Sequence, residues 1–134
     1  MAREDRENEI RDYVHYLDTL HDEVAVEGAD TTVLAFSQGV ATASRWIAYG
    51  RLRPRRLILW GDYLPPDLDM QMAGAAFEHT ELLIVRGTAD GALNEELRAR
   101  EEASLDAAGI AHRFVSYEGG HDIHAETLKE LAGC

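Results

Sequence analysis

The sequence predicts an α/β protein with a mostly parallel sheet of about four strands flanked by helices. Two observations lead to this prediction. The chain contains short apolar runs without alternating polar residues, which is typical of strands covered on both faces. A helix-compatible segment follows each run, and strands alternating with helices of this length indicate parallel pairing through right-handed crossovers. The predicted strands cover residues 32–36, 57–60, 82–85 and 112–117.

The first half of the chain begins with an expected amphipathic helix over residues 4–26. Apolar side chains recur on one side of this segment and charged ones cover the other, and Gly28 ends it. The strand over residues 32–36 then leads into Ser37. A second helix follows directly and closes at Gly50.

The segment after the second strand is expected to be a loop. The strand over residues 57–60 ends at Gly61, and Pro65 and Pro66 keep the next segment out of the sheet, because proline has no amide hydrogen to donate. A weakly helical patch is expected over residues 70–77.

The last part of the chain repeats the strand and helix order. The strand over residues 82–85 runs into a turn over residues 86–91, and Asn94 is predicted to cap a helix that reaches Ala108. After the strand over residues 112–117, a closing helix is expected from an apolar stripe of Ile123, Thr127, Leu128 and Leu131.

The composition bounds the class of protein. A chain of 134 residues predicts a single domain over residues 1–134. Its 13 basic and 25 acidic residues give a net charge of -12, which argues against nucleic acid and anionic membranes as partners. With no apolar run long enough to cross a bilayer and a charged opening segment, we expect a soluble protein of the cytoplasm. The single cysteine, Cys134, excludes an internal disulfide.

Ser37 is the first candidate functional residue. Ala35 and Gly39 flank it two residues away on either side, and such small residues permit a sharp strand-to-helix turn that exposes one side chain at its apex. The amide of Gln38, at the start of the new helix, would point to the same place and could stabilise a negative oxygen. An ordinary helix-capping serine is the alternative interpretation.

Two further loops at strand ends carry Asp90 and His121. In an open parallel sheet, functional groups gather beyond the carboxyl ends of the strands. A serine nucleophile needs a neighbouring base, histidine titrates near neutrality, and a carboxylate on the other ring nitrogen fixes the histidine tautomer. The order serine, aspartate, histidine along the chain is the one expected of this fold class. Together, Ser37, Asp90 and His121 predict an acyl-transfer site.

Each of these residues has another interpretation. Asp90 beside Gly91 could simply make a turn, and His121 could cap the last helix or lie in solvent. A metal site formed by His121, Asp122 and His124 has the spacing of no standard site, so we predict no metal.

Four short segments follow the strand ends: Ala35-Phe36-Ser37-Gln38-Gly39, Leu64-Pro65, Arg86-Gly87-Thr88-Ala89-Asp90 and Glu118-Gly119-Gly120-His121. They resemble successive landmarks of the phospholipase/carboxylesterase branch of the α/β-hydrolase superfamily, which includes the acyl-protein thioesterases. The resemblance extends over nearly the entire chain and is specific as a set. The family usually has glycine where this chain has Ala35, which is also small.

The resemblance implies a truncated α/β-hydrolase and a serine hydrolase that cleaves carboxylic ester or thioester bonds of small-molecule acyl substrates. It implies no metal or organic cofactor. The implied roles are nucleophile for Ser37, general base and then acid for His121, orienting carboxylate for Asp90, oxyanion donor for the Gln38 amide, and a border of the acyl pocket for Tyr63 and Leu64.

The resemblance covers only the carboxyl-terminal part of a family member. The family's first strands, and the loop that supplies a second oxyanion amide, have no counterpart, and losing one such donor costs roughly a hundred- to a thousandfold in turnover. The strand over residues 32–36 would be an exposed edge, so we expect a homodimer that buries this side. The alternative is a weak or inactive hydrolase scaffold that acts as a dimerising or partner-binding module.

Overall fold

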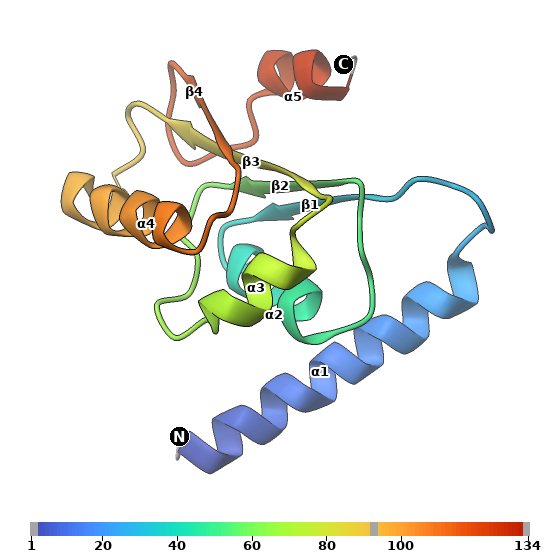
Figure 1. Cartoon of the computed structure of the whole chain (residues 1–134). Helices are drawn as coiled ribbons and strands as arrows, with labels where there is room; N and C mark the ends of the chain where they lie inside the picture. The colour runs from blue at the N-terminus through green and yellow to red at the C-terminus, as the bar shows by residue number, and fades with distance from the viewer. Residues whose placement is uncertain (1–2, 92–93, 133–134) are drawn as a thin grey trace.

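The computed structural model describes residues 3–91 and 94–132, and Cys134 lies outside them. The elements alternate as the sequence predicts (Figure 1). In chain order they are α1 (Arg3–Val24), β1 (Thr32–Phe36), α2 (Gly39–Tyr49), β2 (Arg56–Trp60), α3 (Met70–Ala76), β3 (Glu81–Gly87), α4 (Glu95–Ala107), β4 (Arg113–Tyr117) and α5 (Ala125–Ala132).

The four strands form one sheet in the order β1-β2-β3-β4, and every neighbouring pair is parallel. This confirms the predicted fold class. The register brings the strand ends level, since Phe36 pairs with Trp60, Trp60 with Val85, and Gly87 with Tyr117. The loops after the strands therefore share one edge of the sheet.

Side chains alternate between the two faces of the sheet and build two cores. On one face, Leu57, Leu59 and Ile84 pack with buried residues of α2, α3 and α4. On the other, Trp60 and Val85 pack with α5. Figure 1 shows this division, with α5 above the sheet and α2 and α3 below it. The central strands β2 and β3 are buried on both faces, which explains why their apolar runs contain no alternating polar residues.

Helix α1 lies on the outer side of α2 (Figure 1) and is fastened to it by Asp18. The buried Asp18 carboxylate accepts hydrogen bonds from Trp46 Nε1 at 2.9 Å and from the backbone N–H of Arg51 at 3.1 Å. These bonds satisfy a carboxylate that burial would otherwise penalise. Among the described helices, none is long and apolar enough to span a lipid bilayer.

Several predicted boundaries differ from the structure. Strand β3 extends to Gly87, so Arg86 and Gly87 belong to the strand and not to the predicted turn. Helix α1 ends at Val24 rather than residue 26, because the chain turns at Gly28, which has a φ of +80°. Ile123 does not belong to the closing helix: α5 begins at Ala125, and the Ile123 side chain is exposed. The buried residues of α5 are Thr127 and Leu131, so only the later part of the predicted stripe packs on the sheet.

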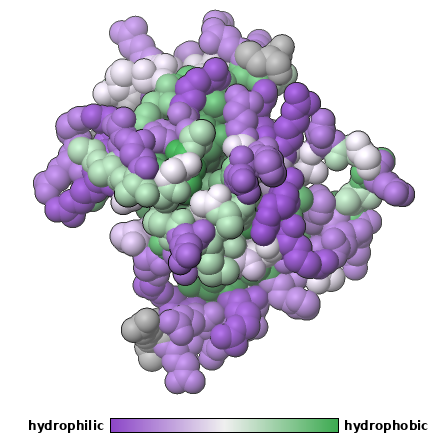
Figure 2. Space-filling model, in the orientation of Figure 1, coloured by the Kyte–Doolittle hydropathy of each residue, from purple (hydrophilic) through white to green (hydrophobic). Residues whose placement is uncertain are grey.

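Strand β1 is an edge of the sheet, as expected from the sequence. Within the described residues it pairs with β2 alone. Leu34 and Phe36 remain 44% and 36% exposed, while Ala35 on the opposite face is buried. Hydrophilic side chains cover most of the surface seen in Figure 2, with apolar atoms showing at its centre.

Candidate active site

Ser37 occupies the turn between β1 and α2. Its φ is +56°, in the left-handed region that non-glycine residues rarely enter. The Ser37 N–H donates to Trp60 O at 2.8 Å, and Ser37 O accepts from Val40 N at 3.0 Å, so both sides of the turn are held. Gln38 is the N-cap of α2, and its amide belongs to the helix-end N–H groups that have no partner four residues earlier.

The structure brings the side chains of Ser37, His121 and Asp90 into one hydrogen-bonded chain. His121 Nε2 lies 2.9 Å from Ser37 Oγ, and His121 Nδ1 lies 2.7 Å from Asp90 Oδ2. The Asp90 side chain is fully buried, whereas that of His121 is 37% exposed. Because an ionised carboxylate only accepts, Nδ1 carries the hydrogen and Nε2 is left to accept the serine proton. This arrangement can activate a hydroxyl for nucleophilic attack.

The loops that carry Asp90 and His121 are bonded to each other through their backbones. Thr88 N donates to Tyr117 O at 2.9 Å and Ala89 N donates to Gly119 O at 2.8 Å. Asp90 N closes the turn on Gly87 O at 3.2 Å. These bonds fix the position of Asp90 relative to His121.

The imidazole of His121 lies between two residues that the sequence analysis did not single out. The Phe36 ring is tilted against it, with ring centroids 5.0 Å apart. On another side lies Gly61, where an added Cβ would be 3.2 Å from His121 Cε1. Phe36 ends one predicted strand and Gly61 directly follows another, and this location at a strand end is what the sequence offers to place them near the site.

Tyr63 and Leu64 lie on the loop between β2 and α3 and are held by α4 and its N-cap. The Tyr63 hydroxyl donates to Asn94 O at 2.9 Å and accepts from Asn94 N at 2.5 Å. The Leu64 side chain is buried in the core, and its N–H donates to Glu101 Oε2 at 2.8 Å. Both residues line a cavity of about 580 Å³, which neither Ser37 nor His121 lines. Their role in substrate binding stays a prediction.

A buried ion pair between Arg86 and Glu101 supports this loop. Arg86 Nη2 lies 2.6 Å from Glu101 Oε1 and also donates to Asp62 O at 3.1 Å. The guanidinium stacks on the Tyr63 ring, 4.3 Å from its centroid. Sequence reasoning missed this pair because its members are 15 residues apart on different elements.

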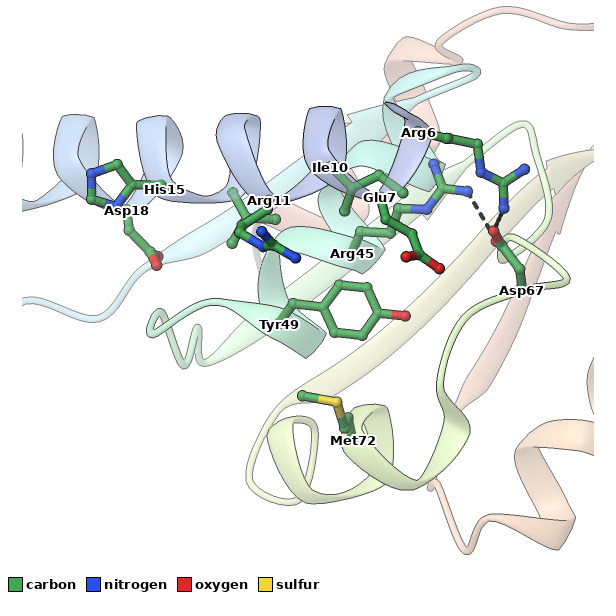
Figure 3. A pocket seen from close by; sticks show the side chains of 11 residues that line it. Arg6, Glu7, Ile10, Arg11, His15, Asp18, Arg45, Tyr49, Asp67 and Met72 are labelled. Carbon is green, nitrogen blue, oxygen red and sulfur yellow. Dashed lines mark hydrogen bonds and ion pairs between the residues drawn. The ribbon is translucent and has the colours of Figure 1, made fainter. Parts of the chain in front are cut away.

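A larger hollow of about 920 Å³ is lined by residues of α1, α2 and α3 and by Asp67 (Figure 3). Arg6 of α1 and Arg45 of α2 both point to Asp67 and form ion pairs with it. Of the residues predicted for the site, none lines this hollow. The ion pairs of Asp67 link α1 and α2 to the loop before α3.

No group of three or more His, Cys, Asp or Glu side chains that could hold a metal ion occurs in residues 3–91 and 94–132. His121 is engaged by Asp90 and Ser37. His124 lies with its Nδ1 2.8 Å from Thr127 Oγ1, at the start of α5.

No protein-family profile and no curated protein matches the chain. Solved structures do match it. Arabidopsis thaliana SOBER1 superposes with a TM-score of 0.71 and 21% identity, over 92% of this chain and 61% of that one. Zea mays acyl-protein thioesterase 2 gives 0.72 and 20%, over 92% and 62%. Esterase PE8 gives 0.68 and 21%, over 95% and 59%.

These neighbours belong to the α/β-hydrolase superfamily and are longer than this chain. Sequence identity near 20% supports similarity of fold alone. The resemblance predicted from the sequence is confirmed at that level, since the four-stranded parallel sheet flanked by helices matches the fold of these neighbours. The chain has an α/β-hydrolase fold and spans about three fifths of the length of the thioesterase and esterase structures that it matches.

Proposed function

We propose that this chain hydrolyses carboxylic ester or thioester bonds, with Ser37 as nucleophile, His121 as general base and acid, and Asp90 as orienting carboxylate. The observation that carries the proposal is the continuous hydrogen-bond chain from Ser37 Oγ through the imidazole to Asp90 Oδ2. The structural neighbours include proteins named as an acyl-protein thioesterase and an esterase, which supports an acyl substrate.

The first half-reaction forms an acyl-enzyme. Ser37 Oγ attacks the substrate carbonyl carbon as its proton passes to His121 Nε2, giving a tetrahedral oxyanion. When this species collapses, the bond to the alcohol or thiol breaks and the leaving group takes the proton from His121. Asp90 stays ionised and stabilises the imidazolium through Nδ1–H.

The second half-reaction releases the acid. Water gives its proton to His121 Nε2 and attacks the acyl carbon, and the bond to Ser37 Oγ then breaks as the proton returns to the serine. In both halves the Gln38 amide would donate to the oxyanion, a role that elsewhere contributes roughly a hundred- to a thousandfold to turnover for each donor. Neither half-reaction needs a metal or an organic cofactor, and small acyl esters are the proposed substrates, bordered by Tyr63 and Leu64.

Labelling with a fluorophosphonate and hydrolysis of p-nitrophenyl butyrate test this proposal together. The wild-type chain should do both, and Ser37→Ala should do neither. Ser116→Ala is the control, because Ser116 is an exposed serine on β4 that lies outside the hydrogen-bonded chain. Unchanged turnover in Ser37→Ala would disprove the proposal.

We also propose that two copies associate along β1. The edge lacks two features that normally prevent pairing, since Thr32–Phe36 has no charge and no proline. A two-fold axis would let the exposed Leu34 and Phe36 of each copy cover the other's. Sedimentation should show a dimer at micromolar concentration and a monomer for Leu34→Lys; a monomeric wild type would contradict the pairing.

A dimer that neither reacts with the fluorophosphonate nor hydrolyses the ester would instead support the interpretation of the chain as an inactive scaffold.

A further inference from the structure

We infer that Tyr117 is a positioning residue for His121: its hydroxyl, together with the indole N–H of Trp60, fixes the backbone on both sides of the imidazole. This inference rests on the proposed function, in which His121 transfers the proton. Tyr117 ends β4 and Trp60 ends β2, and both side chains are buried in the core under α5.

The contacts converge on the backbone carbonyls of the two residues on either side of His121. The Tyr117 hydroxyl lies 2.6 Å from Gly120 O and 2.5 Å from Asp122 O. Trp60 Nε1 lies 3.0 Å from Asp122 O and 3.2 Å from the Tyr117 hydroxyl oxygen. Gly120 immediately precedes His121 and Asp122 immediately follows it, so both ends of the residue are held.

Tyr117 and Trp60 supply the two side-chain hydrogens that reach these carbonyls from the core. The hydroxyl has one hydrogen for two carbonyls, and the indole N–H supplies the second. Because the Tyr117 and Trp60 side chains are buried, the donor ends of these bonds face less competition from water than they would on the surface. Gly120 O also accepts from Asp122 N at 3.0 Å, so replacing the Tyr117 hydroxyl leaves each carbonyl one partner but removes the bond that ties this segment to the end of β4.

The backbone bond from Ala89 N to Gly119 O holds the loop two residues before His121, and the Tyr117 and Trp60 donors extend this support to the residues on either side of the histidine. Gly119 and Gly120 precede it, and glycine backbone has more accessible conformations than any other. The imidazole is more than a third exposed, with Phe36 and Gly61 beside it. A displacement of about 1 Å at a reacting group can cost about a hundredfold in rate, so a loosened loop would slow proton transfer without changing the pocket.

A purely structural role makes a different prediction. If Tyr117 served only to fill the core and to stack on His124, whose ring centroid lies 4.9 Å away, the phenyl ring of Tyr117→Phe would replace it. Removing the Tyr117 hydroxyl would then affect turnover no more than removing the hydroxyl of another tyrosine that bonds to the backbone. Tyr49 is such a residue, since its hydroxyl accepts from Asp69 N at 3.0 Å on the loop before α3.

The test compares Tyr117→Phe with the matched control Tyr49→Phe. We expect Tyr117→Phe to lower kcat about 10- to 100-fold with KM within about twofold of wild type, and to slow fluorophosphonate labelling of Ser37 by a similar factor. Tyr49→Phe should leave all three unchanged. A kcat for folded Tyr117→Phe within about twofold of wild type, or an equal loss in Tyr49→Phe, would overturn the inference.

A rescue experiment probes the mechanism of the effect. Gly120 has room for a Cβ, with no atom within 4 Å of it, so Gly120→Ala stiffens the loop without a clash. Added to Tyr117→Phe, it should raise kcat about two- to fivefold. No recovery of kcat in the double variant would count against loop positioning.

A second readout separates this inference from the proposed function. Amide hydrogen exchange over residues 119–123 should speed up in Tyr117→Phe and not in Tyr49→Phe, whether or not the chain hydrolyses esters. If wild type is inactive but exchange responds in this way, the proposed function fails and the positioning survives. Unchanged exchange refutes the positioning. Should Tyr117→Phe not fold, Trp60→Phe removes the other donor and must show the same exchange response.

Discussion

Gly87, at the end of β3, lies directly against the backbone of Gly120, the residue before His121. A Cβ atom at position 87 would sit 2.6 Å from the Gly120 carbonyl oxygen and would also overlap that of Gly119. Gly87 opens the turn to Asp90, since its carbonyl accepts from Asp90 N. The contact therefore brings the loop of the carboxylate and the loop of the histidine together, and it requires glycine at position 87.

Gly87→Ala is expected to destabilise the fold by about 1 to 3 kcal/mol, because the neighbouring atoms are backbone and cannot swing away. Urea unfolding measures the loss. Gly91→Ala is the matched control: a Cβ there meets no atom within 4 Å, so its free energy of unfolding should stay within about 0.5 kcal/mol of wild type. Equal stabilities for the two variants would contradict the close approach.

The backbone of Ser37 is strained, because a residue with a Cβ atom rarely adopts a positive φ. At a φ of +56°, glycine is comfortable and alanine is not. Ser37→Gly should therefore be more stable than Ser37→Ala by about 1 kcal/mol, although neither variant should hydrolyse an ester. Thermal unfolding of the two variants under the same conditions decides the point, and an alanine variant as stable as the glycine variant would show that the turn is unstrained.

Asp90→Asn should reduce kcat by about ten-thousandfold while the fold persists. The amide that replaces the carboxylate can donate to Nδ1, which favours the tautomer with hydrogen on Nε2 and so removes the acceptor for the serine proton. Steady-state kinetics with p-nitrophenyl butyrate measure the effect. Turnover within about tenfold of wild type would mean that Asp90 does not set the tautomer.

The buried Arg86–Glu101 pair should be costly to break. Glu101→Ala leaves the guanidinium buried beside Tyr63 and removes the acceptor of Leu64 N–H, so we expect a loss of about 3 to 5 kcal/mol. The neighbouring Glu102 provides the control, because its pair with Arg98 is about 40% exposed on both sides. Glu102→Ala should change stability by less than about 1 kcal/mol. Similar losses in urea unfolding for both variants would contradict this difference in burial.

The sequence predicts the features that local pattern controls. Apolar runs marked the buried strands because each central strand is covered on both faces, and Asn94 was readable as a helix cap, which its side-chain bonds to Glu96 N and Leu97 N confirm. The positions of Asp90 and His121 followed from the rule that parallel strands end at one edge.

Contacts between distant residues could not be read in this way. Trp60 and Tyr117 are 57 residues apart, and each looks like an ordinary core aromatic in its own strand. Only the register, which pairs Trp60 with Val85 and Gly87 with Tyr117, shows that both reach the histidine loop. The prediction for Ile123 is wrong because it relies on local spacing alone. Its spacing fits the helical stripe, but the chain is still a loop at this position.

Mass spectrometry of the intact chain during turnover of a slow acyl ester tests the central claim most directly. An acyl-enzyme should appear as one acyl group per chain, mapped by peptide analysis to Ser37 and absent from Ser37→Ala. If the chain hydrolyses the ester while no adduct forms, or if the adduct persists in Ser37→Ala, the hydrogen-bonded chain of Ser37, His121 and Asp90 is not the catalytic site.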